Sequence, residues 1–277
     1  MTSSRIPSIP VLLALAVWTF AARPTPPAAP PPAGPGLENR SLAVEIAGPD
    51  RLRLTNKLSG KTYAAAAAAF ELVLEAAGRT ATVTGADFVP KPAARSSPDT
   101  LRILYAGKGP WAGLSVEVEY VLPAGAAYVR KHLTVANARP DPVVVRDATV
   151  DAVALEGVPL PAKIENPVFL DGQLFWGLEW PIADAAARGG RLALTHFPAA
   201  SVPPGGSWTS KTIGFGVSEP GRIEQTFGRY IQDIRANRVD FATFYFDWLC
   251  HDNSGPRESE VLANFSALRR LKDLYGL

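Results

Sequence analysis

Four side chains that suit sugar binding stand close together near the C-terminal end of the chain: Asp247, Trp248, His251 and Asp252. A carboxylate accepts hydrogen bonds from neighbouring hydroxyl groups, and the face of an indole ring packs against the C–H face of a pyranose. The apolar run Phe241–Leu249, in which the first two lie, reads as a strand buried on both faces, as in a parallel sheet. Barrel active sites form at the carboxyl ends of such strands, and the chemistry of these residues at that place suits the hydroxyls and ring of a saccharide. The structural alternative makes Trp248 a core residue and Asp247 a cap for the following loop.

A second group of aromatic and acidic side chains lies in the segment Phe175–Pro181 (FWGLEWP). Aromatic rings beside a carboxylate could line a saccharide cleft, so Trp176, Glu179 and Trp180 are further candidates for substrate binding. In the alternative interpretation the rings belong to a protein core and Glu179 pairs with an arginine. The residues alone do not separate the two.

Composition excludes several other kinds of chemistry. Lys and Arg number 28 against 26 Asp and Glu, with no basic run, so we expect no nucleic-acid partner. The single cysteine, Cys250, rules out an intrachain disulfide and a cysteine-rich zinc site, and it reads as a small buried residue. The spacing of Asp247, His251 and Asp252 is too loose for a metal site, and no glycine-rich stretch has a phosphate-loop context. We therefore expect neither a metal nor a cofactor.

The first 36 residues read as export and linker sequence. Met1–Ala22 has the pattern of a secretory signal peptide, with an apolar run, Val11–Phe20, that is too short for a comfortable membrane span. Residues 23–36 (Arg23–Gly36) contain seven prolines and form a semi-extended linker. We therefore expect a secreted or periplasmic protein that keeps no stable membrane association once the signal is removed. An uncleaved anchor is the alternative.

The body of the chain, residues 37–219, reads as short strands separated by Gly, Pro, Asn and Asp. Arg51–Thr55, Leu114–Val121 and Val143–Val153 alternate as half-buried antiparallel strands should. Further expected strands are Phe70–Glu75, Leu101–Tyr105, Tyr128–Val135, Leu174–Trp180, Arg191–His196 and Ser207–Val217. Ala64–Ala69 favours a helix by composition, but six residues between strands fit a loop or the start of a strand better. The sequence thus predicts a mainly β fold, a large antiparallel β-supersandwich.

After Pro220 the periodicity becomes helical. Residues 220–239 predict a linker helix, from about Arg222 to Asn237. Residues 240–277 then give a buried strand, the polar loop Cys250–Arg257 and a second amphipathic helix, Glu258–Tyr275. This order is one βα unit, whereas a (β/α)8 barrel takes about 250 residues. We therefore expect the first unit of an incomplete catalytic barrel.

Four segments make the chain resemble the secreted α-galactosidase-like glycoside hydrolases: Leu42–Tyr63, Phe169–Pro181, Phe244–Leu249 and Leu271–Gly276. In that family a galactose-mutarotase-like supersandwich precedes a TIM barrel. The resemblance implies a retaining mechanism, with one Asp as nucleophile on the fourth barrel strand and another as acid/base on the sixth. Both strands would lie beyond Leu277, so no catalytic residue is assigned in this chain. We expect it to be inactive without the missing barrel segment.

Two other functions fit the same residues. One is a non-catalytic, secreted sandwich that binds carbohydrate or acts as a scaffold. The other is a mutarotase-type sugar epimerase, which needs a general base and a paired acid, typically Glu and His. The candidates for that histidine are His132, His196 and His251. His132 reads as an exposed strand residue, and His196 as a structural histidine.

Overall fold

The computed structural model describes residues 34–48 and 50–235, together with residues 259, 262, 263, 265, 266, 269 and 270. The larger of its two sheets has ten strands. Seven of them are neighbours in the order β1 (Gly36–Glu38), β2 (Leu42–Gly48), β3 (Arg51–Asn56), β4 (Lys61–Ala68), β12 (Val143–Leu155), β16 (Arg191–His196) and β15 (Asp184–Arg188). Of the other three, β5 (Glu71–Ala76) and β17 (Ala200–Val202) pair with β12, and β6 (Arg79–Thr84) pairs with β5.

The second sheet has nine strands. Seven of them are neighbours in the order β13 (Val168–Leu170), β14 (Leu174–Leu178), β19 (Ile213–Val217), β11 (Tyr128–Asn137), β10 (Leu114–Val121), β9 (Thr100–Gly107) and β7 (Phe88–Pro90). The other two are β18 (Ser207–Thr209), which pairs with β11, and β8 (Ala94–Ser97), which pairs with β9. Two short 3-10 helices, η1 (Gly85–Asp87) and η2 (Gly109–Trp111), interrupt the strands. The described pairings are antiparallel, for example β10 with β11 and β12 with β16. The predicted large antiparallel sandwich is therefore confirmed.

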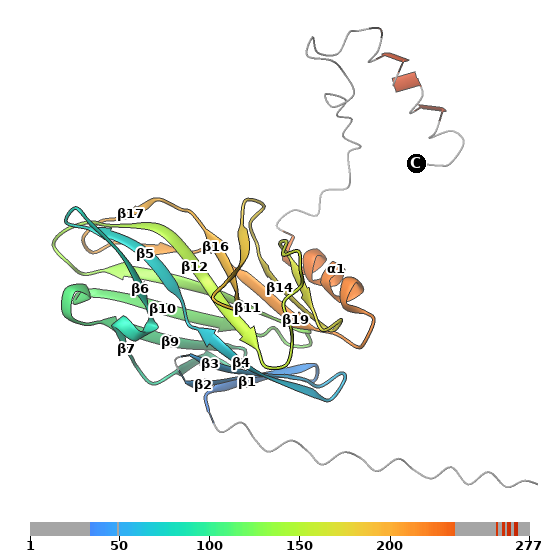
Figure 1. Cartoon of the computed structure of the whole chain (residues 1–277), viewed down its shortest axis with the longest axis horizontal. Helices are drawn as coiled ribbons and strands as arrows, with labels where there is room; N and C mark the ends of the chain where they lie inside the picture. The colour runs from blue at the N-terminus through green and yellow to red at the C-terminus, as the bar shows by residue number, and fades with distance from the viewer. Residues whose placement is uncertain are drawn as a thin grey trace, which may run out of the picture.

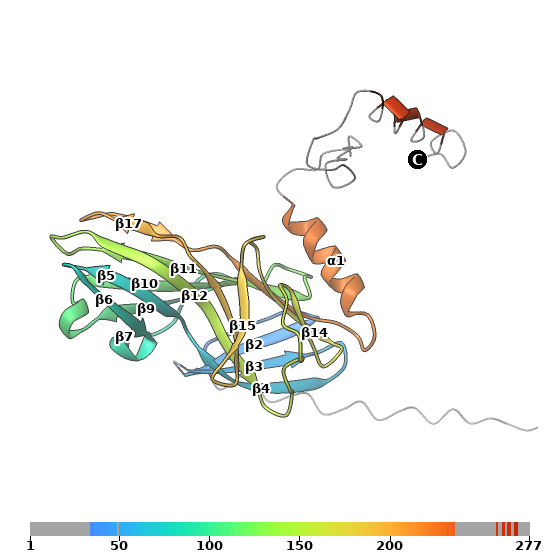
Figure 2. The same cartoon turned by 45° about the horizontal axis from the view of Figure 1, so that its top comes forward.

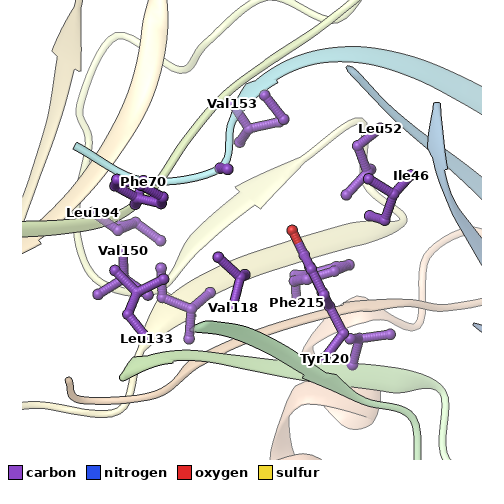
Figure 3. Close-up of a cluster of buried hydrophobic side chains, with 14 of the residues drawn as sticks. Ile46, Leu52, Phe70, Val118, Tyr120, Leu133, Val150, Val153, Leu194 and Phe215 are labelled. Carbon is purple, nitrogen blue, oxygen red and sulfur yellow. The ribbon is translucent and has the colours of Figure 1, made fainter. Parts of the chain in front are cut away.

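The alternation of side chains along the strands explains the two layers in Figure 1. In β10 the residues Leu114, Val116, Val118 and Tyr120 are buried, while the residues between them are partly exposed. Figure 3 shows Ile46 and Leu52, from the ten-stranded sheet, on the other side of the same core from Tyr120 and Phe215 of the nine-stranded sheet. A period of two thus places one apolar face of each sheet against the other.

The alanine run forms a strand rather than a helix or loop. It makes up most of β4, in which Ala65 and Ala67 point inward. β4 pairs with β3 on one side and with the long strand β12 on the other. The backbone N–H and C=O groups on both edges of β4 therefore pair with neighbouring strands, and this pairing overrides the helical preference of alanine.

A helix is present within the range predicted for the linker helix, as α1 (Ile223–Ile234). It packs at one end of the sandwich against β14 and β19 (Figures 1 and 2). Ile223 and Tyr230 are buried in a small cluster with Tyr128 and Phe175. The strand expected over Ser207–Val217 is divided into β18 and β19.

The predicted signal peptide, most of the proline-rich linker and the strand and loop of the βα unit lie outside the described residues. The described residues between 259 and 270 are helical, within the range predicted for the second amphipathic helix. Within the described parts of the chain, no helix combines the length and apolar character that a membrane crossing requires.

Candidate functional site

A groove lies between α1 and the residues that follow β14, and we call it the tryptophan groove. Its volume is about 500 Å³. One wall is formed by Asn166, Pro167 and the stretch from Gly177 to Pro181, and the other by Phe227, Tyr230, Ile231, Ile234 and Arg235. The groove therefore contains part of the segment in which the sequence predicts saccharide contacts. Its size falls within the range of about 300–1,000 Å³ that is usual for small-molecule sites.

Asn166 fixes the shape of one wall. Its side-chain amide donates to the carbonyl of Leu178 at 2.8 Å and to that of Trp180 at 3.3 Å, and its side-chain oxygen accepts from the Leu178 amide at 2.8 Å. The last residue of β14 and the chain at Trp180 are thus held by hydrogen bonds to one side chain. Such preorganisation lowers the entropy lost when a ligand binds.

Glu179 connects the sandwich to the helix. Its carboxylate accepts two hydrogen bonds from the Arg130 guanidinium, at 2.8 and 2.6 Å, and a third from the Tyr230 hydroxyl at 2.7 Å. The Glu179 side chain is only 16% exposed. Hydrogen bonding to Glu179 raises the pKa of Arg130, and burial together with the neighbouring carboxylate raises the pKa of Tyr230. Of the two sequence interpretations of Glu179, the structure has the one with an arginine partner.

Trp180 is the exposed one of the three aromatic residues that line the groove. It is 37% exposed, and the Lys211 ammonium lies 4.0 Å from its ring centroid. A cation at this distance over an indole is attracted by the negative face of the ring, and it limits the orientations that the ring can take. Trp180 is therefore an oriented and partly exposed ring, with Lys211 over one of its faces.

Trp176 has a different position from the one predicted for a saccharide contact. Its side chain is fully buried and stacks on Phe215, with the ring centroids 4.6 Å apart and the planes at 5°. Its indole N–H donates to Asp151 Oδ2 at 2.9 Å. Strand alternation points Trp176 into the core, so neither face of its ring is available to a ligand. The core interpretation holds for this residue.

Asp151 and Lys131 form an ion pair in the centre of the sandwich. Lys131 Nζ lies 2.9 Å from Asp151 Oδ1, and the two side chains are 1% and 4% exposed. The ammonium also lies 5.6 Å from the centroid of the Tyr120 ring. Because β11 and β12 belong to different sheets, the pair joins the two layers. The sequence interpretation missed it, although Lys131 shares the phase of the buried residues Val129 and Leu133.

The two described histidines have structural surroundings. His196 is 4% exposed, stacks on Trp208 and accepts a hydrogen bond from the Lys211 amide at Nε2, at 3.3 Å. Burial, with a further contribution from Lys211, lowers the pKa of His196 to about 4. His132 lies 3.7 Å from Glu119 on the neighbouring strand β10. The described structure therefore gives His196 the position of a neutral core residue.

Asp247, Trp248, His251 and Asp252 lie outside the described residues, so their predicted sugar contacts stay predictions. Within the described part of the chain, no group of three or more His, Cys, Asp or Glu side chains could hold a metal ion.

Comparison with known proteins gives similarity to solved structures only. No family model and no curated protein matches the sequence. An alpha-mannosidase from Enterococcus faecalis is 12% identical with a TM-score of 0.44, and the match covers 73% of this chain and 31% of that chain. A protein of glycosyl hydrolase family 38 from the same organism is 13% identical with a TM-score of 0.43, over 73% and 32% of the two chains.

A galactose mutarotase related enzyme from Lactobacillus acidophilus is 9% identical with a TM-score of 0.42, over 66% of this chain and 97% of that one. This chain thus spans about a third of the length of the two Enterococcus faecalis proteins.

Proposed function

We propose that this chain is the sandwich part of a secreted carbohydrate-active enzyme, and that it binds saccharide in the tryptophan groove without catalysing a reaction itself. The observation that supports this most directly is Trp180, a partly exposed indole that Lys211 holds in the wall of a groove of about 500 Å³. A pyranose stacked on the free area of this ring would bury apolar surface, and the groove would exclude water from its edge.

The contacts of Glu179 support a binding role over a catalytic one. A general acid or base must exchange a proton with the substrate, and a nucleophile must present a free oxygen. Glu179 instead accepts three hydrogen bonds from Arg130 and Tyr230. Its role in the proposal is to hold α1 against the sandwich and so to keep the two walls of the groove at a fixed separation.

The more specific parts of the proposal come from the sequence. The enzyme would belong to the α-galactosidase-like, retaining class and would be exported from the cytoplasm. Activity would need a catalytic barrel segment. Sugar contacts would be made by Asp247, Trp248, His251 and Asp252. The resemblance of the opening and closing segments supports them.

The scaffold function is the second candidate, and the same carboxylate favours it. The bonds of Glu179 to Arg130 and Tyr230 give α1 one fixed orientation, which a following domain could use. The epimerase is less well supported, because His196 is buried and its lowered pKa keeps the imidazole neutral at neutral pH, so no imidazolium is present to act as the acid.

Isothermal titration calorimetry of the full chain with a methyl α-galactoside separates these functions. We expect saturable binding, and Trp180→Ala should weaken it about tenfold or more, because truncating a large aromatic side chain removes about 1.5–3 kcal/mol of apolar burial. Phe197→Ala is the matched control, since Phe197 is 55% exposed and does not line the groove. Saturable binding that survives Trp180→Ala would refute the groove as its location. Absence of binding to the unmodified chain would leave the scaffold function.

A further inference from the structure

A second concave surface lies on the other side of α1, and we call it the arginine cleft. Its volume is about 370 Å³, and it is lined by one face of the helix, the segment from Gly125 to Tyr128 and the loop at Arg40 and Ser41. Tyr230 lines both this cleft and the tryptophan groove, so the helix separates two sites (Figure 2 shows its position at the end of the sandwich).

Three arginines line this cleft: Arg40, Arg222 and Arg229. Arg222 is the N-cap residue of α1, and Arg229 lies about two helical turns further along the chain. Arg40 comes from the loop before β2 and reaches over the turn at Gly125, where an added Cβ would lie 3.6 Å from Arg40 Nη2. Chain segments far apart in the sequence therefore bring the three positive charges to one place.

The acidic residues of the cleft leave two of these charges without a partner. Glu219 lies 3.3 Å from Arg222, and Asp233 accepts a hydrogen bond from the Tyr128 hydroxyl at 3.4 Å. Among the residues that the structure describes, neither Arg40 nor Arg229 has an ion pair or a side-chain hydrogen bond. A guanidinium fork is suited to a planar carboxylate, which it binds through two parallel hydrogen bonds.

Neutral polar groups complete the lining. The side chains of Ser41, Gln225 and Thr226 border the cleft and make no side-chain hydrogen bond within the described structure. Hydroxyl and amide groups both donate and accept hydrogen bonds, so they can pair with the hydroxyls of a sugar ring. The N-terminus of α1 also has no side-chain cap, and its partial positive charge adds to the field of the arginines.

We propose that the arginine cleft binds an acidic saccharide, with the carboxylate of a uronic acid between Arg40 and Arg229 and the ring hydroxyls on Ser41, Gln225 and Thr226. The proposal that this chain binds carbohydrate is used for the choice of ligand, whereas the location rests on the unpaired arginines. The enzyme of which this chain is part would thereby be directed to glycans that carry acidic sugars.

Galacturonate and galactose are matched probes, because they differ only in the carboxylate or hydroxymethyl group at C6. In calorimetric titrations of the full chain at low salt we expect galacturonate to bind. Arg40→Gln and Arg229→Gln should each weaken it about tenfold, as expected for the loss of a hydrogen bond to a charged group. Arg79→Gln is the control, because Arg79 is exposed on β6, away from the cleft, and the substitution should leave the affinity unchanged. Added salt should weaken the binding of galacturonate.

Three results would overturn the inference. They are equal affinity for galactose and galacturonate, galacturonate binding that survives both arginine substitutions, and complete competition by inorganic sulfate at the same concentration. The third result would show a site for small anions in general. Trp180→Ala should not affect galacturonate binding, so a failure of the tryptophan groove and a failure of the arginine cleft are distinguishable.

Discussion

Substituting Asp151 by Asn tests whether the buried ion pair joins the two sheets. Both partners of the carboxylate are donors, the Lys131 ammonium on Oδ1 and the Trp176 indole N–H on Oδ2, each at 2.9 Å. An amide has one oxygen and one NH2 group. In Asp151→Asn the NH2 group therefore faces a donor whichever way the amide is turned, and Lys131 is left without an anionic partner in a site where it is only 1% exposed.

The expected loss of stability is large. Removing one partner of a buried ion pair costs about 3–5 kcal/mol, because the remaining charge is left without compensation. That is a large part of a total unfolding free energy of about 5–15 kcal/mol. For a domain of this size it corresponds to a fall in Tm of about 6–20 °C.

Urea and thermal unfolding of the full chain, followed by circular dichroism, measure this loss. Asp147→Asn is the control, since Asp147 lies on the same strand, is partly exposed and should change stability by less than about 0.5 kcal/mol. The double variant Lys131→Met with Asp151→Leu should recover most of the stability, because it removes both charges. Its remaining deficit of about 1–3 kcal/mol reflects the unpaired Trp176 N–H. A loss below about 1 kcal/mol in Asp151→Asn would refute the argument.

Two other sites give independent tests. A Cβ at Gly214 would lie 2.0 Å from the Tyr230 hydroxyl oxygen, so Gly214→Ala should expel Tyr230, destabilise the protein by about 1–3 kcal/mol and speed hydrogen exchange in α1. Gly228→Ala, which meets nothing within 4 Å, should be neutral or stabilising, and equal exchange in the two variants would contradict this reasoning. Because the pKa of His196 falls from 6.5 to about 4, the unfolded chain binds a proton in that range that the folded protein does not. Stability should fall by up to about 1.4 kcal/mol per pH unit as the pH drops through the range, and urea unfolding of His196→Gln should lack this component.

The residues near Trp180 show which features of a site local sequence can predict and which it cannot. The aromatic and acidic composition of Phe175–Pro181 identifies the segment as a candidate binding site, but it does not show whether each side chain faces a ligand or the core. Alternation along β14 turns Trp176 inward, whereas Trp180 comes after the strand has ended and stays 37% exposed. The partners of Glu179 lie 49 and 51 residues away in the sequence, so no local pattern contains them.

The sequence by itself determined the two antiparallel sheets and the helix that follows them, because hydrophobic periodicity is a local property that repeats along each segment. It also contained the signal for Lys131, which has the phase of a buried residue in β11. Only the tertiary structure decided which charges meet. It pairs Lys131 with Asp151 across the sheets, joins Arg130 to Glu179, and brings Arg40 to the same cleft as Arg229. These contacts depend on strand order and on the packing of α1, which are set by burial summed over the whole core.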